Sequence, residues 1–459
     1  MSPERRRLHR AAIAVNALKT LRSAAFPLLV VLVLSVFGGG FDLEALIRGA
    51  IYGGVATTIA VVVGYLTWMT TTWWVTPDAI HFRTGLLGTK QTDVPLARVQ
   101  ALDLEQGPMQ RLFGVRAVHV QTGGGGSRGE IALEAIGDAE IAELRGLVSG
   151  VAPVERTVDL ERRLGGSMLL VAALTAGQLG VILPVLAGAG QLMDDALGDE
   201  VFRLLPDTPM EFVLGAVALL VVAWLLSVAG AVVAFAGFTL ARDGDRLRIR
   251  RGLVARRDAT VPVERVRAVE VVEGVLRRPF GLAALRMEVI GHAQEPTAAQ
   301  LLFPLLRRRD VRPFLDGFLP ELADDLDGLE PVPRRALRRY VLPPAALALV
   351  LGSGAWIAGL GPAPLLVVIP AALYGALRWR DAGWRLEGDR LAVRSLRLAR
   401  RTLLAPARRR ESHTVAQTLL QRRASLANLE VEFGKSATAR VHHLEATTAQ
   451  GVFDRLSRI

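Results

Sequence analysis

The sequence contains no cysteine, so disulfide bonds, thiolate metal sites and a cysteine nucleophile are excluded. Lysine is nearly absent too, since the 55 basic residues include only Lys19, Lys90 and Lys435. Two explanations of the resulting arginine excess remain open, namely the bias of a GC-rich genome and an anionic partner. The cysteine content does not identify the cellular compartment.

Patterns that carry catalytic or metal chemistry are also missing from the sequence. The seven histidines form no His-x-x-x-His or Glu-x-x-His pair, and the neighbours His442 and His443 would face opposite sides of a strand. The glycine run 123–126 is not followed by the Gly-Lys-Ser/Thr that holds a phosphate and a magnesium ion. We therefore expect no catalytic residues, no metal site, no cofactor and no enzymatic activity.

Apolar and charged residues are both abundant, at 51% and 22% of the chain, so they must be segregated along it. Such a pattern is typical of membrane spans that alternate with soluble modules. The net charge of +11 suits an anionic partner, either nucleic acid or the cytoplasmic leaflet. Nucleic acid is disfavoured, because the basic regions lack interleaved aromatic residues and no helix-turn-helix pattern is present.

Long apolar runs occur in pairs along the sequence. A bilayer core of about 30 Å needs about 20 mostly apolar residues per helix. Six runs approach that length, at residues 23–40, 50–73, 165–188, 212–238, 340–360 and 364–377. We therefore predict six transmembrane helices in three hairpins. None has an ionisable residue near its centre, which argues against a solute carrier.

The distribution of arginine predicts the orientation of these hairpins. Basic residues flank the base of every pair, for example Arg162 and Arg334, whereas the connection between the third and fourth runs contains Asp194 and Asp199. Cytoplasmic loops of membrane proteins carry the excess of arginine and lysine. We therefore expect a multi-pass protein of the cell membrane whose termini and soluble modules are all cytoplasmic.

The segments after the second, fourth and sixth runs are one unit repeated three times. In each copy a proline lies 17 residues after an aspartate, an arginine follows the proline by three residues, and a small residue follows it by 19. These repeat markers are Asp78, Pro95, Arg98 and Gly114; Asp245, Pro262, Arg265 and Gly281; and Asp389, Pro406, Arg409 and Ser425. Three copies with identical spacing indicate one fold used three times.

Each copy begins with alternating apolar and polar residues, for example Leu247 and Ile249 between arginines, which predicts a half-buried strand. Further strand patterns follow. Each copy then ends in a helical pattern, at residues 138–148, 308–319 and 448–456. The expected unit is a β-sheet structure closed by one C-terminal helix.

The motifs of the second copy resemble those of a known family. A strand that enters from a membrane helix is followed by Gly252-Leu-Val, Pro262-x-x-Arg-Val and Arg278-Pro-Phe-Gly. This order resembles the bacterial PH-like domain of the YdbS/YdbT-like membrane proteins. The resemblance implies a small antiparallel barrel or sandwich with a helix plugging one end, in a bacterial cell membrane. The third copy departs from it at Leu396 and Ser425, where the other copies have glycine.

The predicted organisation is therefore a mixed membrane α-helical and β protein of six parts. A basic segment with the first hairpin spans residues 1–74, and PH-like domain 1 spans 75–155. The second hairpin and PH-like domain 2 span 156–238 and 239–325. The third hairpin spans 326–380, and the divergent PH-like domain 3 spans 381–459.

Arginines of the second copy form the candidate binding site. Arg246, Arg248 and Arg250 share one strand face, and Arg256, Arg257 and Arg265 follow nearby. Each arginine near an anionic surface contributes about 1 kcal/mol, and this falls off over a Debye length. The position is similar to that where eukaryotic PH domains bind phosphoinositide headgroups. Contact with anionic phospholipid headgroups and a solvated or protein-contacting face both remain open.

Two functions follow as hypotheses from different classes. In the first, cytoplasmic PH-like domains form a binding platform at the inner leaflet, for anionic lipid or for a smaller membrane protein of the same family. In the second, the protein is a membrane transport or envelope-protection component whose transmembrane helices carry the activity.

Overall fold

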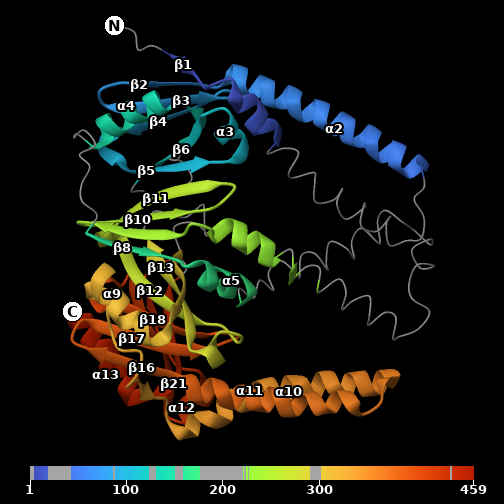
Figure 1. Ribbon diagram of the computed structural model, residues 1–459. Coiled ribbons are helices and arrows are strands. Elements are labelled where there is room, and N and C mark those ends of the chain that lie inside the picture. Colours follow the sequence, from blue (N-terminus) through green and yellow to red (C-terminus); the bar gives the residue numbers. More distant parts are fainter. Residues whose placement is uncertain are drawn as a thin grey trace. The chain divides into compact units, whose positions relative to one another are not determined.

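The computed structural model describes residues 5–18, 43–85, 88–122, 131–149, 159–175, 221, 224–225, 227–289, 301–434 and 437–459. The chain forms two compact units. The first comprises residues 1–157, 163–239 and 248–260, and the second comprises residues 158–162, 240–247 and 261–459. Figure 1 gives the element labels used below.

The first unit begins with a four-stranded antiparallel sheet in the order β1-β2-β3-β4. Its strands are β1 (Arg6–Arg7), β2 (Thr72–Val75), β3 (Ala79–Thr84) and β4 (Lys90–Pro95), and α2 (Leu43–Thr70) leads into β2. The guanidinium of Arg6 lies 5.7 Å from the ring centre of Trp73 and its Nη1 is 2.6 Å from Oε2 of Glu143. The basic N-terminal segment is thereby fixed to the sheet.

A second sheet faces the first across an apolar core. It contains β5 (Val99–Gln106), β6 (Arg116–Thr122) and β7 (Ile131–Ile136), with α3 (Pro108–Leu112) after β5 and α4 (Asp138–Ser149) after β7. Trp73 and Ile80 of the first sheet pack with Val118 and Leu133 of the second and with Leu144 of α4. This confirms the predicted PH-like sheet module closed by a C-terminal helix.

A strand of the second repeat extends the sheet of the first repeat. Strand β11 (Arg256–Pro262) pairs antiparallel with β5, with Arg257 opposite Glu105. The hairpin strands β9 (Thr239–Asp243) and β10 (Arg246–Arg251) precede it. Further described elements of this part of the chain are β8 (Leu160–Arg163) and α5 (Gly166–Thr175). The first two repeats are therefore joined by main-chain hydrogen bonds.

The same joint links the second and third repeats inside the second unit. Its seven-stranded sheet has the order β14-β13-β12-β18-β17-β16-β15. The strands are β12 (Val266–Glu273), β13 (Leu282–Val289), β14 (Leu301–Arg307), β15 (Glu330–Pro331), β16 (Gly383–Glu387), β17 (Arg390–Leu396) and β18 (Arg400–Pro406). Val271 of β12 lies opposite Thr402 of β18. In both joints the third hairpin strand of one repeat pairs with the first strand of the preceding repeat's second sheet.

The third repeat is completed by the sheet β19-β20-β21 and two helices. These elements are β19 (Ser412–Ala416), α12 (Leu419–Arg423), β20 (Leu426–Glu432), β21 (Thr438–Glu445) and α13 (Ala446–Arg458). Trp384 and Leu391 pack with Leu429, Leu444 and Val452 in one buried cluster. The divergent third copy therefore keeps the PH-like fold.

The C-terminal helix of the second copy is α9 (Val311–Phe318).

The repeat markers have structural roles in all three copies. The backbone N–H of Leu96, Val263 or Ala407 donates a hydrogen bond to the carbonyl of the marker aspartate, which closes the hairpin. Each marker proline precedes a 3-10 turn that ends at the marker arginine: η1 (Leu96–Arg98), η2 (Val263–Arg265) and η9 (Ala407–Arg409). The last marker has a left-handed backbone, with φ of 64° at Gly114, 59° at Gly281 and 50° at Ser425.

A long helical hairpin leaves the sheets of the second unit (Figure 1). Helix α10 (Leu337–Ala355) follows η6 (Arg334–Ala336) and continues into η7 (Trp356–Leu360), after which η8 (Ala363–Val367) and α11 (Val368–Asp381) return alongside it. A Cβ atom on Gly375 of α11 would lie 2.5 Å from the carbonyl oxygen of Tyr340, so this glycine permits the close approach of the two helices.

The prediction of six transmembrane helices in three hairpins is wrong. Within the described ranges, one helix, Arg334–Gly359, is long and apolar enough to cross a bilayer, and the apolar helices Thr57–Thr70 and Gly166–Thr175 are shorter. The run 364–377 does not form a helix long enough to cross a bilayer. Its start lies in η8, and α11 has 14 residues, whereas about 20 are required. The run 23–40 and much of 165–188 and 212–238 lie outside the described residues.

Candidate functional site

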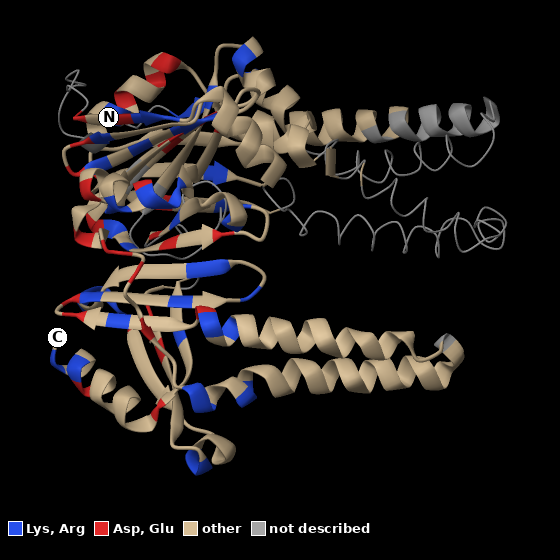
Figure 2. Ribbon diagram, turned by 60° about the horizontal axis from the view of Figure 1, so that its bottom comes forward, with Lys and Arg blue, Asp and Glu red and all other residues tan. Residues whose placement is uncertain are grey.

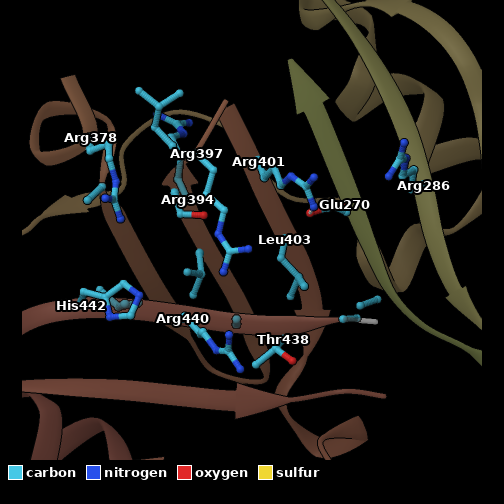
Figure 3. A pocket seen from close by; sticks show the side chains of 18 of the residues that line it. Glu270, Arg286, Arg378, Arg394, Arg397, Arg401, Leu403, Thr438, Arg440 and His442 are labelled. Carbon is cyan, nitrogen blue, oxygen red and sulfur yellow. Dashed lines mark hydrogen bonds and ion pairs between the residues drawn. The ribbon is translucent and has the colours of Figure 1, made fainter. Parts of the chain in front are cut away.

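An arginine-lined pocket of about 390 Å³ lies in the second unit, where α10 and α11 meet the sheets (Figure 3). Strands β12, β13, β17, β18 and β21 contribute its walls together with Tyr340 of α10 and Arg378 of α11. Two glutamates, Glu270 and Glu288, face six arginines: Arg286, Arg378, Arg394, Arg397, Arg401 and Arg440. The lining is therefore strongly positive.

Contacts between the helices and the third repeat fix the inner wall of the pocket. The hydroxyl of Tyr340 donates a hydrogen bond of 3.0 Å to the carbonyl oxygen of His442 on β21. The guanidinium of Arg378 lies 5.7 Å from the ring centres of both Tyr340 and Tyr374. These cation–π contacts hold a charged group at the base of the helices without neutralising it.

Buried arginine N–H groups in the pocket lack hydrogen-bond partners. Among the described residues, Nε of Arg378, Nη2 of Arg394 and Nε of Arg401 are buried and donate no hydrogen bond to any acceptor in the protein. Figure 3 shows the Arg394 side chain extending into the pocket between Arg378 and Arg401. Buried donors are costly unless they are satisfied, so these arginine side chains are held in the pocket wall without full compensation by acceptors of the protein.

Few of these arginines are neutralised by carboxylates. Nη1 of Arg401 lies 3.3 Å from Oε1 of Glu270, and Nη2 of Arg440 lies 2.6 Å from Oε1 of Glu430. Nε of Arg394 donates only to the hydroxyl of Thr402, at 3.3 Å. In the part of the chain that the structure describes, Arg378, Arg394 and Arg397 form no ion pair. The pocket thus keeps a net positive charge.

Two pKa shifts show the positive potential. Burial lowers the pKa of Arg394, and the charges of Arg400 and Arg308 lower it further. Burial also lowers the pKa of His442, and the charges of Arg378, Arg440 and Arg397 add to the effect. A nearby negative charge would stabilise the charged form of both groups and raise both pKa values.

The arrangement is suited to binding a phosphate-bearing group. Guanidinium groups bind phosphate oxygens with paired, charge-assisted hydrogen bonds. A volume of about 390 Å³ lies within the roughly 300–1,000 Å³ of small-ligand pockets. His442 offers a neutral imidazole beside the arginines, and the wall formed by Val393, Leu396 and Leu403 is apolar.

The arginines predicted as lipid ligands are placed differently. On β10, Arg246 and Arg250 are exposed and Arg248 is half-buried, and all lie on one strand face. Arg248 donates from Nε and Nη2 to Asp258, at 3.0 and 2.6 Å, and Arg250 donates to the same carboxylate at 3.3 Å. Burial acts to raise the pKa of Asp258, but the two arginines outweigh it and lower the pKa.

The other three predicted arginines do not complete a pocket with these. Nη2 of Arg257 donates to Oε1 of Glu105 at 3.1 Å, across the joint between β11 and β5. Arg256 is exposed on the same strand. Arg265 is half-buried at the end of η2, and burial lowers its pKa. Three of the six predicted ligands, Arg248, Arg250 and Arg257, are therefore engaged by carboxylates, while Arg246, Arg256 and Arg265 have no carboxylate partner among the described residues.

The pocket itself was missed from the sequence because its residues are scattered from Ala268 to His442. One signal was available, namely Arg397, which stands where the first two copies have Leu86 and Leu253. Arg394 and Arg401 do not depart from the repeat, because they stand where the second copy has Arg250 and Arg257. The sequence therefore offered one divergent residue of the pocket and no indication of where the pocket lies.

Comparisons with known proteins agree with this architecture. Residues 23–152, 171–317 and 341–458 match the family described as Bacterial PH domain. The chain is also 24% identical over 489 aligned positions to the UPF0699 transmembrane protein YdbT of Bacillus subtilis (strain 168), covering 98% of this chain and 96% of that protein. Three PH-like modules and a membrane-associated relative give one assignment: the chain belongs to the bacterial PH domain family.

Proposed function

We propose that this protein is a membrane-bound binding platform whose third PH-like module binds the phosphate of an anionic lipid headgroup at the inner leaflet. The observation that carries the proposal is the set of guanidinium donors on Arg378, Arg394 and Arg397, which line the pocket and form no ion pair among the described residues. They converge on one pocket that contains more cations than anions. A phosphodiester supplies the acceptor oxygens and the negative charge that these donors lack.

The location of the pocket favours a lipid over a dissolved ligand. Helix α10 exposes apolar side chains such as Leu347, Val350 and Leu351, as a helix in contact with lipid does. Tyr340 and Arg378, near the base of α10 and α11, line the pocket. A headgroup of the leaflet that α10 enters is therefore within reach of the arginines.

Charge at the helix ends supports the cytoplasmic orientation. Arg338 and Arg339 begin α10, and Arg378 and Arg380 end α11, whereas both helices are uncharged along their length (Figure 2). Cytoplasmic ends of membrane helices carry such an excess of arginine. We place the sheets of this unit, and so the pocket, in the cytoplasm.

A binding titration tests the proposal. Full-length protein in nonionic detergent is titrated calorimetrically with dihexanoyl-phosphatidylglycerol, dihexanoyl-phosphatidylcholine and inorganic phosphate. We expect phosphatidylglycerol to bind at least tenfold more tightly than the other two. The double variant Arg394→Gln/Arg397→Gln should lose at least tenfold in affinity, about 1.4 kcal/mol. The matched variant Arg390→Gln, at the far end of the same strand, should bind as the wild type does.

Other outcomes have definite meanings. Equal affinity of the wild type and the double variant would overturn the assignment of the pocket. Phosphate that binds as tightly as phosphatidylglycerol would show that a free anion, and not a headgroup, is the ligand.

A smaller membrane protein of the same family remains a predicted partner of the platform, and it would be found by isolating partners in mild detergent.

A further inference from the structure

Exposed apolar side chains gather on three loops of the second unit. Val275, Leu276 and Phe280 lie in the turn between β12 and β13, with exposed fractions of 68%, 55% and 74%. Leu398 lies in the turn between β17 and β18 and is 70% exposed. Leu419 and Leu420 begin α12 and are 79% and 62% exposed. We call these six residues the apolar rim.

Direct contacts place two of these loops at the ends of α10 and α11. Nη1 of Arg278, beside Phe280, lies 2.7 Å from Oδ2 of Asp381, the last residue of α11. Nη2 of Arg339, in the first turn of α10, donates a hydrogen bond to the carbonyl oxygen of Leu420. Both turns therefore lie at the level where the helices leave the sheets.

The turn that carries Leu398 lies at the same level. Nη2 of Arg400, two residues after Leu398, is 2.5 Å from Oδ1 of Asp381. On β17, Arg394 pairs with Gly383, which follows α11 by two residues. The opposite end of this hairpin, at Arg390, is a strand length away, about 20 Å for six steps of about 3.3 Å. All three loops of the apolar rim thus face the side from which α10 extends.

Arginines accompany each part of the rim. Arg277 and Arg278 lie between Leu276 and Phe280, Arg397 precedes Leu398, and Arg422 and Arg423 follow Leu420. A surface that combines exposed leucine or phenylalanine with arginine is typical of segments lying in the membrane interface. Isolated exposed apolar residues need no explanation, whereas several on one face of a protein mark an interaction site.

The first unit shows the same feature independently. Leu253 and Val254 are exposed in the turn after β10, and the N–H of Leu253 donates a 2.9 Å hydrogen bond to the carbonyl oxygen of Val233, in the preceding apolar helix. Leu112 and Phe113 are exposed at the end of α3, at the position equivalent to the Phe280 turn. Exposed apolar turns therefore recur in the repeats, and the one at Leu253 contacts an apolar helix.

We infer that the apolar rim inserts into the interfacial layer of the bilayer that α10 enters, so that the membrane holds the second unit by its sheets as well as by its helices. This inference rests on the placement of α10 in the bilayer under the proposed function. The rim would fix the tilt of the sheets and keep the arginine pocket against the headgroups. The occupant is phospholipid, because the helix ends bring the rim to its surface and arginines flank each loop.

Single-cysteine labelling tests this directly, because the chain has no cysteine of its own. Phe280→Cys, Leu398→Cys and Leu420→Cys are each labelled with the environment-sensitive fluorophore NBD in the full chain, reconstituted in nanodiscs of phosphatidylcholine and phosphatidylglycerol. Leu351→Cys, within α10, is the reference for lipid, and Arg390→Cys, exposed at the far end of β17, is the matched reference for water.

We expect blue-shifted emission at the three rim positions and at least twofold stronger quenching there by shallow spin-labelled lipid than at Arg390→Cys. Aqueous iodide should quench Arg390→Cys at least twofold more strongly than the rim. Rim labels as accessible to iodide as Arg390→Cys, together with lipid quenching at Leu351→Cys, would overturn the insertion of the rim and keep α10 in the bilayer. Iodide access at Leu351→Cys would overturn both placements.

Discussion

Ser425 and Gly281 adopt the same left-handed backbone conformation, with φ of 50° and 59°, at equivalent positions of the third and second repeats. Glycine adopts this conformation without a steric penalty, whereas a residue with a Cβ atom is strained by about 1 kcal/mol or more. No atom lies within 4 Å of the position that a Cβ would occupy on Gly281, so the strain comes from the backbone alone. The third repeat therefore keeps its fold although Ser425 is conformationally strained.

Exchanging these two residues should change local stability in opposite directions. Ser425→Gly should stabilise the third module by about 0.5–1 kcal/mol, and Gly281→Ser should destabilise the second by a similar amount. Amide hydrogen exchange of β20 and β13 in the full chain measures the two effects. Unchanged hydrogen exchange in both variants would show that the left-handed conformation does not explain why glycine occupies this marker position.

Binding of the headgroup should strengthen at low pH. Burial and the charges of Arg378, Arg440 and Arg397 lower the pKa of His442, while Glu430 acts in the opposite direction. A bound phosphodiester favours the imidazolium and raises that pKa, so the complex takes up a proton and affinity rises as the pH falls from about 7 towards 5. Phosphatidylglycerol does not itself titrate in this range.

A calorimetric titration of phosphatidylglycerol at several pH values checks this prediction. His442→Gln should remove the pH dependence and leave the neutral-pH affinity within about threefold of the wild type. The same pH dependence in the variant would show that a group other than His442 carries the proton. Burial and the charge of His442 lower the pKa of His443 to about 4, which places its titration below this window.

The joint between the first two repeats should depend on Glu105. A hydrogen bond from His119 and the charge and hydrogen bond of Arg257 lower the pKa of Glu105 to about 2, against the opposing effect of burial. Because the folded pKa lies below the ordinary value of 4.5, this stabilisation is present above pH 4.5 and is lost as the pH falls towards 2.

Glu105→Gln should weaken the joint by up to about 1 kcal/mol at neutral pH, as expected for a partly exposed pair. Hydrogen exchange of the β11 amides measures the change, which corresponds to roughly fivefold faster exchange. Glu264→Gln, an exposed glutamate on η2, is the control and should leave these amides unchanged. Identical exchange in both variants would mean that the main-chain bonds alone hold the joint.

The two helices of the second unit should separate if Gly375 is enlarged. A Cβ atom there meets the carbonyl oxygen of Tyr340 at 2.5 Å, whereas one on Gly354 of α10 meets nothing within 4 Å. Gly375→Leu should therefore lower stability by about 1–3 kcal/mol, and Gly354→Leu should be tolerated. Thermal unfolding in detergent followed by circular dichroism compares them. Equal midpoints would contradict the close packing of α10 on α11.

The sequence predicts local features of this protein better than distant ones. The markers Asp245, Pro262 and Gly281 predict one fold used three times, and each acts on the backbone beside it, for example in the hydrogen bond that closes the hairpin at Asp245. The joints between repeats, such as Val271 opposite Thr402, were not predicted, since pairing of strands far apart in sequence leaves no local pattern. The pocket is missed for the same reason.

The number of membrane helices was overestimated because hydropathy ignores helix geometry. Residues 364–377 are apolar, but the described helix begins with a 3-10 turn at Ala363 and its α-helical part runs from Val368 to Asp381. Likewise, the ion pairs of Arg248 with Asp258 and of Arg257 with Glu105 involve residues that the sequence separates by 10 and 152 positions. A count of arginines cannot show which of them a carboxylate neutralises.

Native mass spectrometry tests most directly whether the arginine pocket holds an anionic headgroup. The full chain is released from nanodiscs that contain equal amounts of phosphatidylglycerol and phosphatidylcholine, and the lipid that stays bound is identified by mass. We predict that the wild type and Arg390→Gln retain phosphatidylglycerol in preference to phosphatidylcholine, and that Arg394→Gln/Arg397→Gln retains at least tenfold less. Equal retention of phosphatidylglycerol by the double variant and the wild type would contradict the account.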